Sequence, residues 1–105
     1  MDRKAVNREI LLSVWKVLFL HLATEGDVIG QWMINELRHH GYDVSPGTLY
    51  PILKRMEKNG WLVSKADPER GPKAPRAYRI TKEGRAVLKV VRQQLRELGV
   101  EVGKA

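Results

Sequence analysis

One short segment of the chain, Ser45–Gly47, restricts the fold more than any other feature, because it defines where a helix begins. Serine is favoured just before a helix, where its hydroxyl can accept from the free N–H groups of the first turn. Pro46 fits the first helical position, since a missing N–H does no harm there. Asn59-Gly60 then provides a stop signal, so the sequence predicts a helix over about 45–59.

This predicted helix has two chemically different sides. Its apolar residues recur at three- and four-residue spacing and should pack on the domain: Leu49, Ile52, Leu53 and Met56. Its polar and basic residues are left for the other side: Thr48, Tyr50, Lys54, Arg55 and Lys58. A helix with one packing side and one basic side is typical of a DNA-recognition helix.

Two further helices are predicted before this one. The first covers about residues 3–23, with apolar residues on more than one side, and is therefore expected to be buried nearly all round. Asp27 is predicted to cap a second helix that ends at Gly41. The short turn Tyr42–Ser45 leads directly into the recognition helix, which is the arrangement of a helix-turn-helix.

The region after the recognition helix predicts a β-hairpin and a last helix. Residues 61–65 and 76–80 are rich in strand-forming side chains, and the segment between them contains prolines and a glycine that prevent regular structure. Thr81 is a suitable N-cap for a helix over about 82–98. The predicted fold is thus mainly α with a small β-hairpin wing: one domain over about 3–81, followed by a C-terminal helix.

The composition limits the classes of function that are open. The formal net charge is +7, from 19 Lys and Arg against 12 Asp and Glu, which favours a polyanionic partner such as nucleic acid or a membrane surface. The apolar stretch 10–23 is shorter than the roughly 20 residues that span a bilayer. No cysteine is present, and the adjacent His39 and His40 cannot chelate from one helix face. We therefore predict a cytoplasmic protein without a metal or cofactor, and no enzyme motif suggests catalysis.

The segment Ser45–Pro51, the Gly60–Leu62 strand start, the Pro/Gly-rich wing and Tyr78–Thr81 together resemble the PadR-type transcriptional regulators, over roughly residues 10–98. The resemblance implies a winged helix-turn-helix that binds operator DNA. Members often carry a His-Gly-Tyr triplet in the second helix, where this chain reads Ile-Gly-Gln-Trp over 29–32, so no role is transferred to that triplet.

The residues expected to contact double-stranded DNA lie at the start of the recognition helix and in the wing: Ser45, Gly47, Thr48, Tyr50, Lys54, Arg70, Lys73 and Arg76. Side chains near the N-terminus of a recognition helix reach base edges, and flanking basic residues hold phosphates. Two alternatives remain open. Ser45 can be only a helix cap and Tyr50 a packing residue, and the basic wing can be a solvated loop.

The C-terminal helix carries a stripe typical of a short coiled coil, with Leu88, Val91, Leu95, Leu98 and Val102 at alternating spacings of three and four. The resemblance implies a homodimer in which this helix packs on the partner's first helix, whose candidate residues are Trp15, Phe19 and Leu22. The alternative is packing on its own domain.

The predicted function is a sequence-specific DNA-binding transcriptional regulator, in the form of a homodimeric repressor that reads a pseudo-palindromic operator. The alternative is a winged-helix adaptor that contacts protein, since the fold alone does not imply DNA binding. Trp32 and Trp61 could line a pocket for a small hydrophobic effector, although core packing is the ordinary role of such side chains.

Overall fold

The computed structural model describes residues 1–66 and 75–104. Its first helical region is continuous but contains three parts: α1 (Arg3–Val6), the π-helical segment η1 (Asn7–Leu11) and α2 (Leu12–Leu22). A 3₁₀ turn, η2 (Ala23–Glu25), ends it. The predicted long helix is therefore confirmed, and the π-helical segment within it was not predicted.

The second predicted helix is present, but it begins differently. Helix α3 (Gly30–His39) has Ile29 at its N-cap, and no side chain caps it. Asp27 instead forms an ion pair with Arg79, whose Nε lies 2.9 Å from Asp27 Oδ1. The prediction that Asp27 caps this helix is wrong, because Val28–Ile29 is extended and forms the strand β1 between Asp27 and the helix.

The recognition helix, α4 (Pro46–Lys58), has the predicted limits, with Ser45 at its N-cap. The main-chain oxygen of Ser45 accepts from the N–H groups of Thr48 and Leu49, at 3.1 and 3.0 Å. The Ser45 hydroxyl makes no capping bond and lies 3.2 Å from the Thr48 hydroxyl. The expected side-chain cap is thus absent, and both hydroxyls are exposed beside each other.

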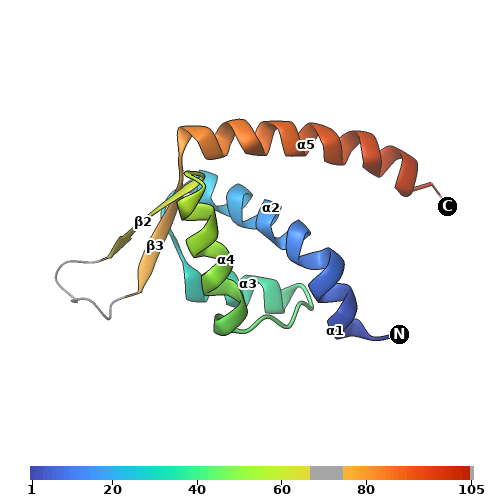
Figure 1. The fold of residues 1–105 in the computed structure, drawn as a ribbon, viewed down its shortest axis with the longest axis horizontal. Helices are drawn as coiled ribbons and strands as arrows, with labels where there is room; N and C mark the ends of the chain where they lie inside the picture. Colours follow the sequence, from blue (N-terminus) through green and yellow to red (C-terminus); the bar gives the residue numbers. More distant parts are fainter. Residues whose placement is uncertain (67–74, 105) are drawn as a thin grey trace.

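The hairpin consists of β2 (Leu62–Ala66) and β3 (Arg76–Ile80), which pair antiparallel with Leu62 opposite Ile80 and Ala66 opposite Arg76. Strand β1 joins the other edge of β3, so the sheet has the order β1-β3-β2. The hairpin projects away from the helices (Figure 1). The prediction of a wing hairpin is confirmed, and the third strand is an addition to it.

The last helix, α5 (Lys82–Val102), extends a few residues beyond its predicted end. Thr81 is its N-cap, as predicted, and its hydroxyl oxygen accepts from the Gly84 N–H at 2.9 Å. The first half of α5 contacts α2, and the second half extends past the other helices (Figure 1). In the part of the chain that the structure describes, no helix is both long and apolar enough to cross a membrane.

A single apolar cluster holds these elements together. Its fully buried members come from α2, α3, α4, α5 and the turn before α4: Phe19, Met33, Ile34, Leu37, Val44, Leu49, Leu53, Met56 and Leu88. All four apolar residues predicted to pack along the recognition helix are buried, which confirms its inward side. Its polar side is therefore presented to solvent.

Candidate nucleic-acid interface

The outward side of α4 is polar and positively charged. Gly47, Lys54 and Lys58 follow each other at spacings of seven and four residues, so they lie along one side of the helix, and all three are exposed. Glu57 is the only carboxylate in α4, and it accepts a 2.9 Å hydrogen bond from the Ser64 hydroxyl of β2. Because that acid faces the sheet, the outward side of the helix is left basic.

The start of α4 brings three of the predicted DNA-binding residues together. Ser45, Gly47 and Thr48 are exposed, and the two hydroxyls lie within 3.2 Å of each other. A Cβ placed on Gly47 would meet nothing nearer than the Ser45 hydroxyl oxygen, at 3.8 Å. The main chain at this helix end is therefore open to a ligand, with two hydroxyl groups beside it that can both donate and accept.

Tyr50 combines the two roles that the sequence left open. Its ring lies against α3, where a Cβ on Gly30 would come within 2.7 Å of Tyr50 Cε1. Gly30 thus allows the ring to approach the backbone of α3 closely. Tyr50 is nevertheless 39% exposed, so one part of the ring packs while another part faces solvent. Its contact with DNA stays a prediction.

A chain of hydrogen bonds connects the wing to the recognition helix. Arg76 Nε donates to Ser64 Oγ at 2.9 Å, and the Ser64 hydroxyl donates to Glu57 Oε2 at the same distance. Arg76, on β3, is therefore exposed and also anchored through β2 to α4. The other two predicted wing residues, Arg70 and Lys73, lie outside the described residues. These two hydrogen bonds fix the base of the wing relative to α4.

Tyr78 lies opposite Ser64 in the pairing of β2 with β3, and it is only 4% exposed. Burial raises the pKa of Tyr78 above its ordinary value of 10.0, and the nearby Glu57 carboxylate raises it further. The phenol therefore stays neutral in the folded protein at pH values at which the unfolded chain loses the proton. The neutral Tyr78 side chain thus belongs to the apolar core and packs β3 against it.

We expect this Tyr78 phenol to make the fold sensitive to alkali. Because its pKa is raised in the folded state, its contribution is complete below pH 10.0 and is lost as the pH rises above that value. Urea unfolding at a series of pH values from neutral to alkaline should show stability falling above about pH 10 in the wild type and falling less in Tyr78→Phe. An equal fall in both proteins would contradict the assignment.

The predicted dimer residues divide into two groups. Trp15, Phe19 and Leu88 are buried within the single chain, at 2%, 0% and 2% exposure. Almost none of their surface is accessible to a partner, so we place them in the core of the chain and not in a dimer interface. Leu22 and Val91 are half-buried, whereas Leu95 and Leu98 are exposed to 47% and 56%.

The first helical region presents a different apolar side from the one expected. Ile10 is 60% exposed and Val14 is 46% exposed, although a helix buried nearly all round was predicted. Together with Leu95 and Leu98, these side chains are apolar surface that the single chain does not cover. The sequence indicates that some apolar side chains of this helix are left over, since the helix is apolar on several sides. The pattern does not show which side faces the protein's own core.

The two tryptophans proposed for an effector pocket lie in different surroundings. Trp32 is 47% exposed and borders a hollow of about 350 Å³, whose other walls include Leu22, Glu25 and Ile29. Trp61 is partly buried against the core. Among the described residues, no three His, Asp or Glu side chains gather as metal ligands. The exposed His40 places its Nε2 atom 3.5 Å from Oε1 of the half-buried Glu36.

Comparisons with known proteins agree with this geometry. Residues 19–90 match the family model described as "Transcriptional regulator PadR-like family". The transcriptional regulator Rv3488 of Mycobacterium tuberculosis (strain ATCC 25618 / H37Rv) is 46% identical over 95 residues, which is 90% of this chain and 88% of that protein.

Solved structures show the same fold. A PadR family transcriptional regulator from Eggerthella lenta DSM 2243 superposes with a TM-score of 0.75 at 31% identity, covering 98% of this chain and 94% of its own. The PadR-like regulator BC4206 from Bacillus cereus strain ATCC 14579 gives a TM-score of 0.77 at 28% identity, with 90% and 93% covered. The predicted winged helix-turn-helix is therefore confirmed.

Proposed function

This chain belongs to the PadR-like family of transcriptional regulators, and on that premise we propose that it is a homodimeric repressor that reads a pseudo-palindromic operator. The observation that carries the proposal is the outward side of α4. Gly47, Lys54 and Lys58 line that side, and the only carboxylate of the helix, Glu57, is bonded to Ser64 instead. This surface has the charge and width that a major groove accepts.

In the proposed complex, α4 lies in the major groove with its N-terminal end toward the bases. The hydroxyls of Ser45 and Thr48, 3.2 Å apart, can donate to or accept from base edges. Lys54 holds a phosphate, and the wing, anchored through Arg76, follows the neighbouring backbone or minor groove. Tyr50 borders the same surface. We also propose that Arg70 and Lys73 contact DNA.

The proposed dimer uses the apolar surface that the single chain leaves open. Leu95 and Leu98 on α5, with Ile10 and Val14 on the first helical region, are large exposed apolar side chains that a second copy would cover. A two-fold axis then presents two copies of α4 to half-sites about 34–36 Å apart, or a multiple of that distance. We take residues about 3–81 as the DNA-binding part and α5 as the dimerisation helix.

Repression requires no further activity from such a dimer. A protein bound to an operator prevents the transcription machinery from binding the same DNA. The proposed place of action is the cytoplasm. The hollow beside Trp32 is where we place a small hydrophobic effector, if one controls release from DNA.

The test is binding by fluorescence anisotropy to DNA from upstream of the protein's own gene and to a shuffled duplex, across a range of salt. We expect preference for the upstream DNA and affinity that falls steeply with salt. Lys54→Ala should reduce the slope of log affinity against log salt by about 1.8, because one phosphate contact is lost in each protomer of the dimer. Thr48→Ala should instead reduce the preference between the two duplexes.

Lys104→Ala is the matched control, since Lys104 follows α5 and its amine lies 3.4 Å from Glu101. This variant also removes one positive charge, but at a position outside α4. It should leave the salt dependence of the affinity unchanged. Equal and weak binding of the wild type to both duplexes would reject the proposal and favour a protein-contacting adaptor.

A further inference from the structure

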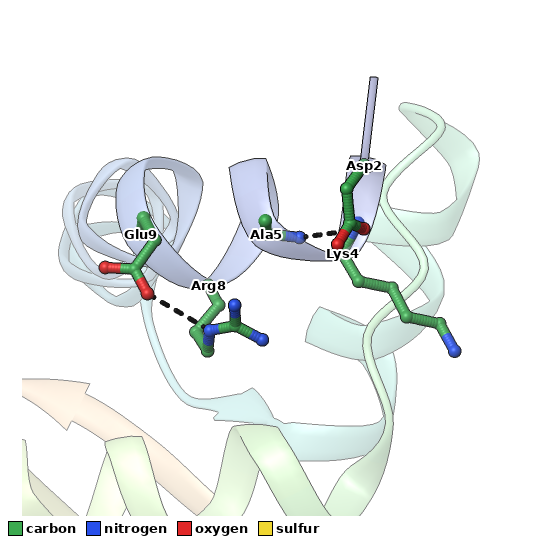
Figure 2. A network of polar contacts seen from close by, with 5 residues as sticks. All are labelled: Asp2, Lys4, Ala5, Arg8 and Glu9. Carbon is green, nitrogen blue, oxygen red and sulfur yellow. Dashed lines mark hydrogen bonds and ion pairs between the residues drawn. The ribbon is translucent and has the colours of Figure 1, made fainter.

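A second basic surface lies beside the start of the recognition helix. It is formed by residues near the N-terminus of the chain. A hollow of about 340 Å³ separates the first helical region from the turn that precedes α4. We call it the N-terminal hollow; its lining residues include Lys4, Asn7 and Arg8 on one wall and Asp43 and Thr48 on the other. Figure 2 shows the Lys4 and Arg8 side chains projecting from α1 and η1, with Lys4 toward the connection that leads into α4.

We infer that Lys4 and Arg8 hold a DNA backbone phosphate next to the position that Thr48 occupies in the groove. The inference rests on the proposed function, because it needs α4 to enter the major groove. Thr48 borders both the N-terminal hollow and the outward start of α4. A duplex that places bases against Thr48 therefore brings the adjoining backbone to Lys4 and Arg8.

The charges around the N-terminal hollow favour an anion. Two cations, Lys4 and Arg8, face one carboxylate, Asp43, among the lining residues. Lys4 forms no ion pair within residues 1–66 and 75–104. Arg8 donates through Nε to Glu9 at 3.1 Å, but both side chains are about two-thirds exposed, so this pair is weak. That bond uses only Nε, so the two terminal nitrogens of the Arg8 guanidinium remain as donors that can bind a phosphate.

The first helical region is also held in place, as a phosphate contact in fixed register requires. The Asp2 carboxylate accepts from the N–H groups of Lys4 and Ala5, at 3.0 and 3.3 Å, so the helix start is capped at the point where Lys4 emerges (Figure 2). Farther along, the rings of Trp15 and Tyr42 meet edge to face at a centroid distance of 5.4 Å. This contact ties α2 to the turn before α4, so Lys4, Arg8 and Thr48 keep their relative positions.

The test compares the wild type with the double variant Lys4→Gln/Arg8→Gln, which keeps a polar side chain at both positions and removes both charges. Because each protomer of the proposed dimer loses one phosphate contact, we expect the salt slope to fall by about 1.8. Between 50 and 200 mM salt the wild type should then lose about twelvefold more affinity than the variant. The preference for upstream over shuffled DNA should stay the same, because a phosphate contact carries no sequence information.

Lys16→Gln is the matched control: it removes a charge from the same helical region at a residue that does not line the N-terminal hollow. A slope unchanged in the double variant, or an equal change in Lys16→Gln, would overturn the inference. If the wild type does not prefer upstream DNA, the proposed function itself is rejected. The wild type is therefore measured before any variant is compared.

Neutral methylphosphonates, introduced one at a time along the upstream duplex, locate the contact. At one position flanking each half-site, the substitution should weaken the wild type and leave the double variant unaffected. Equal weakening of both proteins at every position would overturn the assignment to Lys4 and Arg8. Matching thermal unfolding curves for the two proteins would show that the change is confined to binding.

Discussion

Gly84→Ala is expected to lower the free energy of unfolding by about 2–3 kcal/mol, because α5 begins in close contact with the hairpin at this point. A Cβ on Gly84 would lie 2.1 Å from the main-chain oxygen of Trp61 and 2.8 Å from Ile80 Cγ1. The same Trp61 oxygen accepts the Thr81 N–H at 3.0 Å, so a shift that relieves the clash also disturbs this hydrogen bond. Urea unfolding followed by circular dichroism measures the loss.

Gly99→Ala is the matched control on the same helix. A Cβ there would meet no atom within 4 Å, so the substitution adds only helix propensity. We expect Gly99→Ala to raise the free energy of unfolding by about 0.5–1 kcal/mol. The two alanines should therefore act in opposite directions, and a similar small effect at both positions would show that α5 does not press on the Trp61 backbone.

The recognition helix could be predicted from the sequence almost to the residue, because its signals are local. Ser45 and Pro46 define its start, and the spacing of its apolar residues assigns its inward side, as the structure confirms. The side-chain cap was the detail that failed. The main-chain oxygen of Ser45 accepts from the N–H groups of Thr48 and Leu49, and the Ser45 hydroxyl lies beside the Thr48 hydroxyl instead of capping the helix.

The error at Asp27 has a different cause. Val28–Ile29 is too short to show alternation, and its extended form depends on pairing with β3. The ion pair between Asp27 and Arg79 joins residues 52 positions apart. Aspartate before an apolar-periodic stretch is a good local capping signal, but a distant strand and a distant arginine determined its structure.

The first helical region shows what periodicity cannot decide. Trp15 and Phe19 are buried, whereas Ile10 and Val14 are exposed, although all four belong to one apolar stretch. Which side of the helix is buried depends on where α5 and the helix-turn-helix pack. The sequence of the apolar stretch does not identify that side. For the same reason Lys4 and Arg8 could not be predicted as neighbours of Thr48: only the fold brings these segments to one hollow.

The substitution Leu95→Asp/Leu98→Asp is expected to give a monomer whose affinity for a two-half-site operator is at least about a hundredfold lower than that of the wild type. Leu95 and Leu98 are exposed to 47% and 56% and continue the stripe whose first member, Leu88, is buried in the chain's own core. Carboxylates at these positions would have to be buried in the proposed dimer interface, which is strongly unfavourable. The chain itself should fold normally, since neither leucine is part of its core.

Light scattering after size-exclusion chromatography measures the oligomeric state, and anisotropy compares a duplex with two half-sites against one with a single half-site. Val90→Asp is the matched control, because Val90 is 63% exposed but lies two residues from Leu88 and therefore off the stripe. It should remain dimeric. The affinity loss in the double variant should be confined to the two-half-site duplex, since each chain keeps its own α4. A variant that stays dimeric, or that loses equal affinity for both duplexes, would refute the role of this stripe, because avidity is lost only when two linked recognition helices become separate molecules.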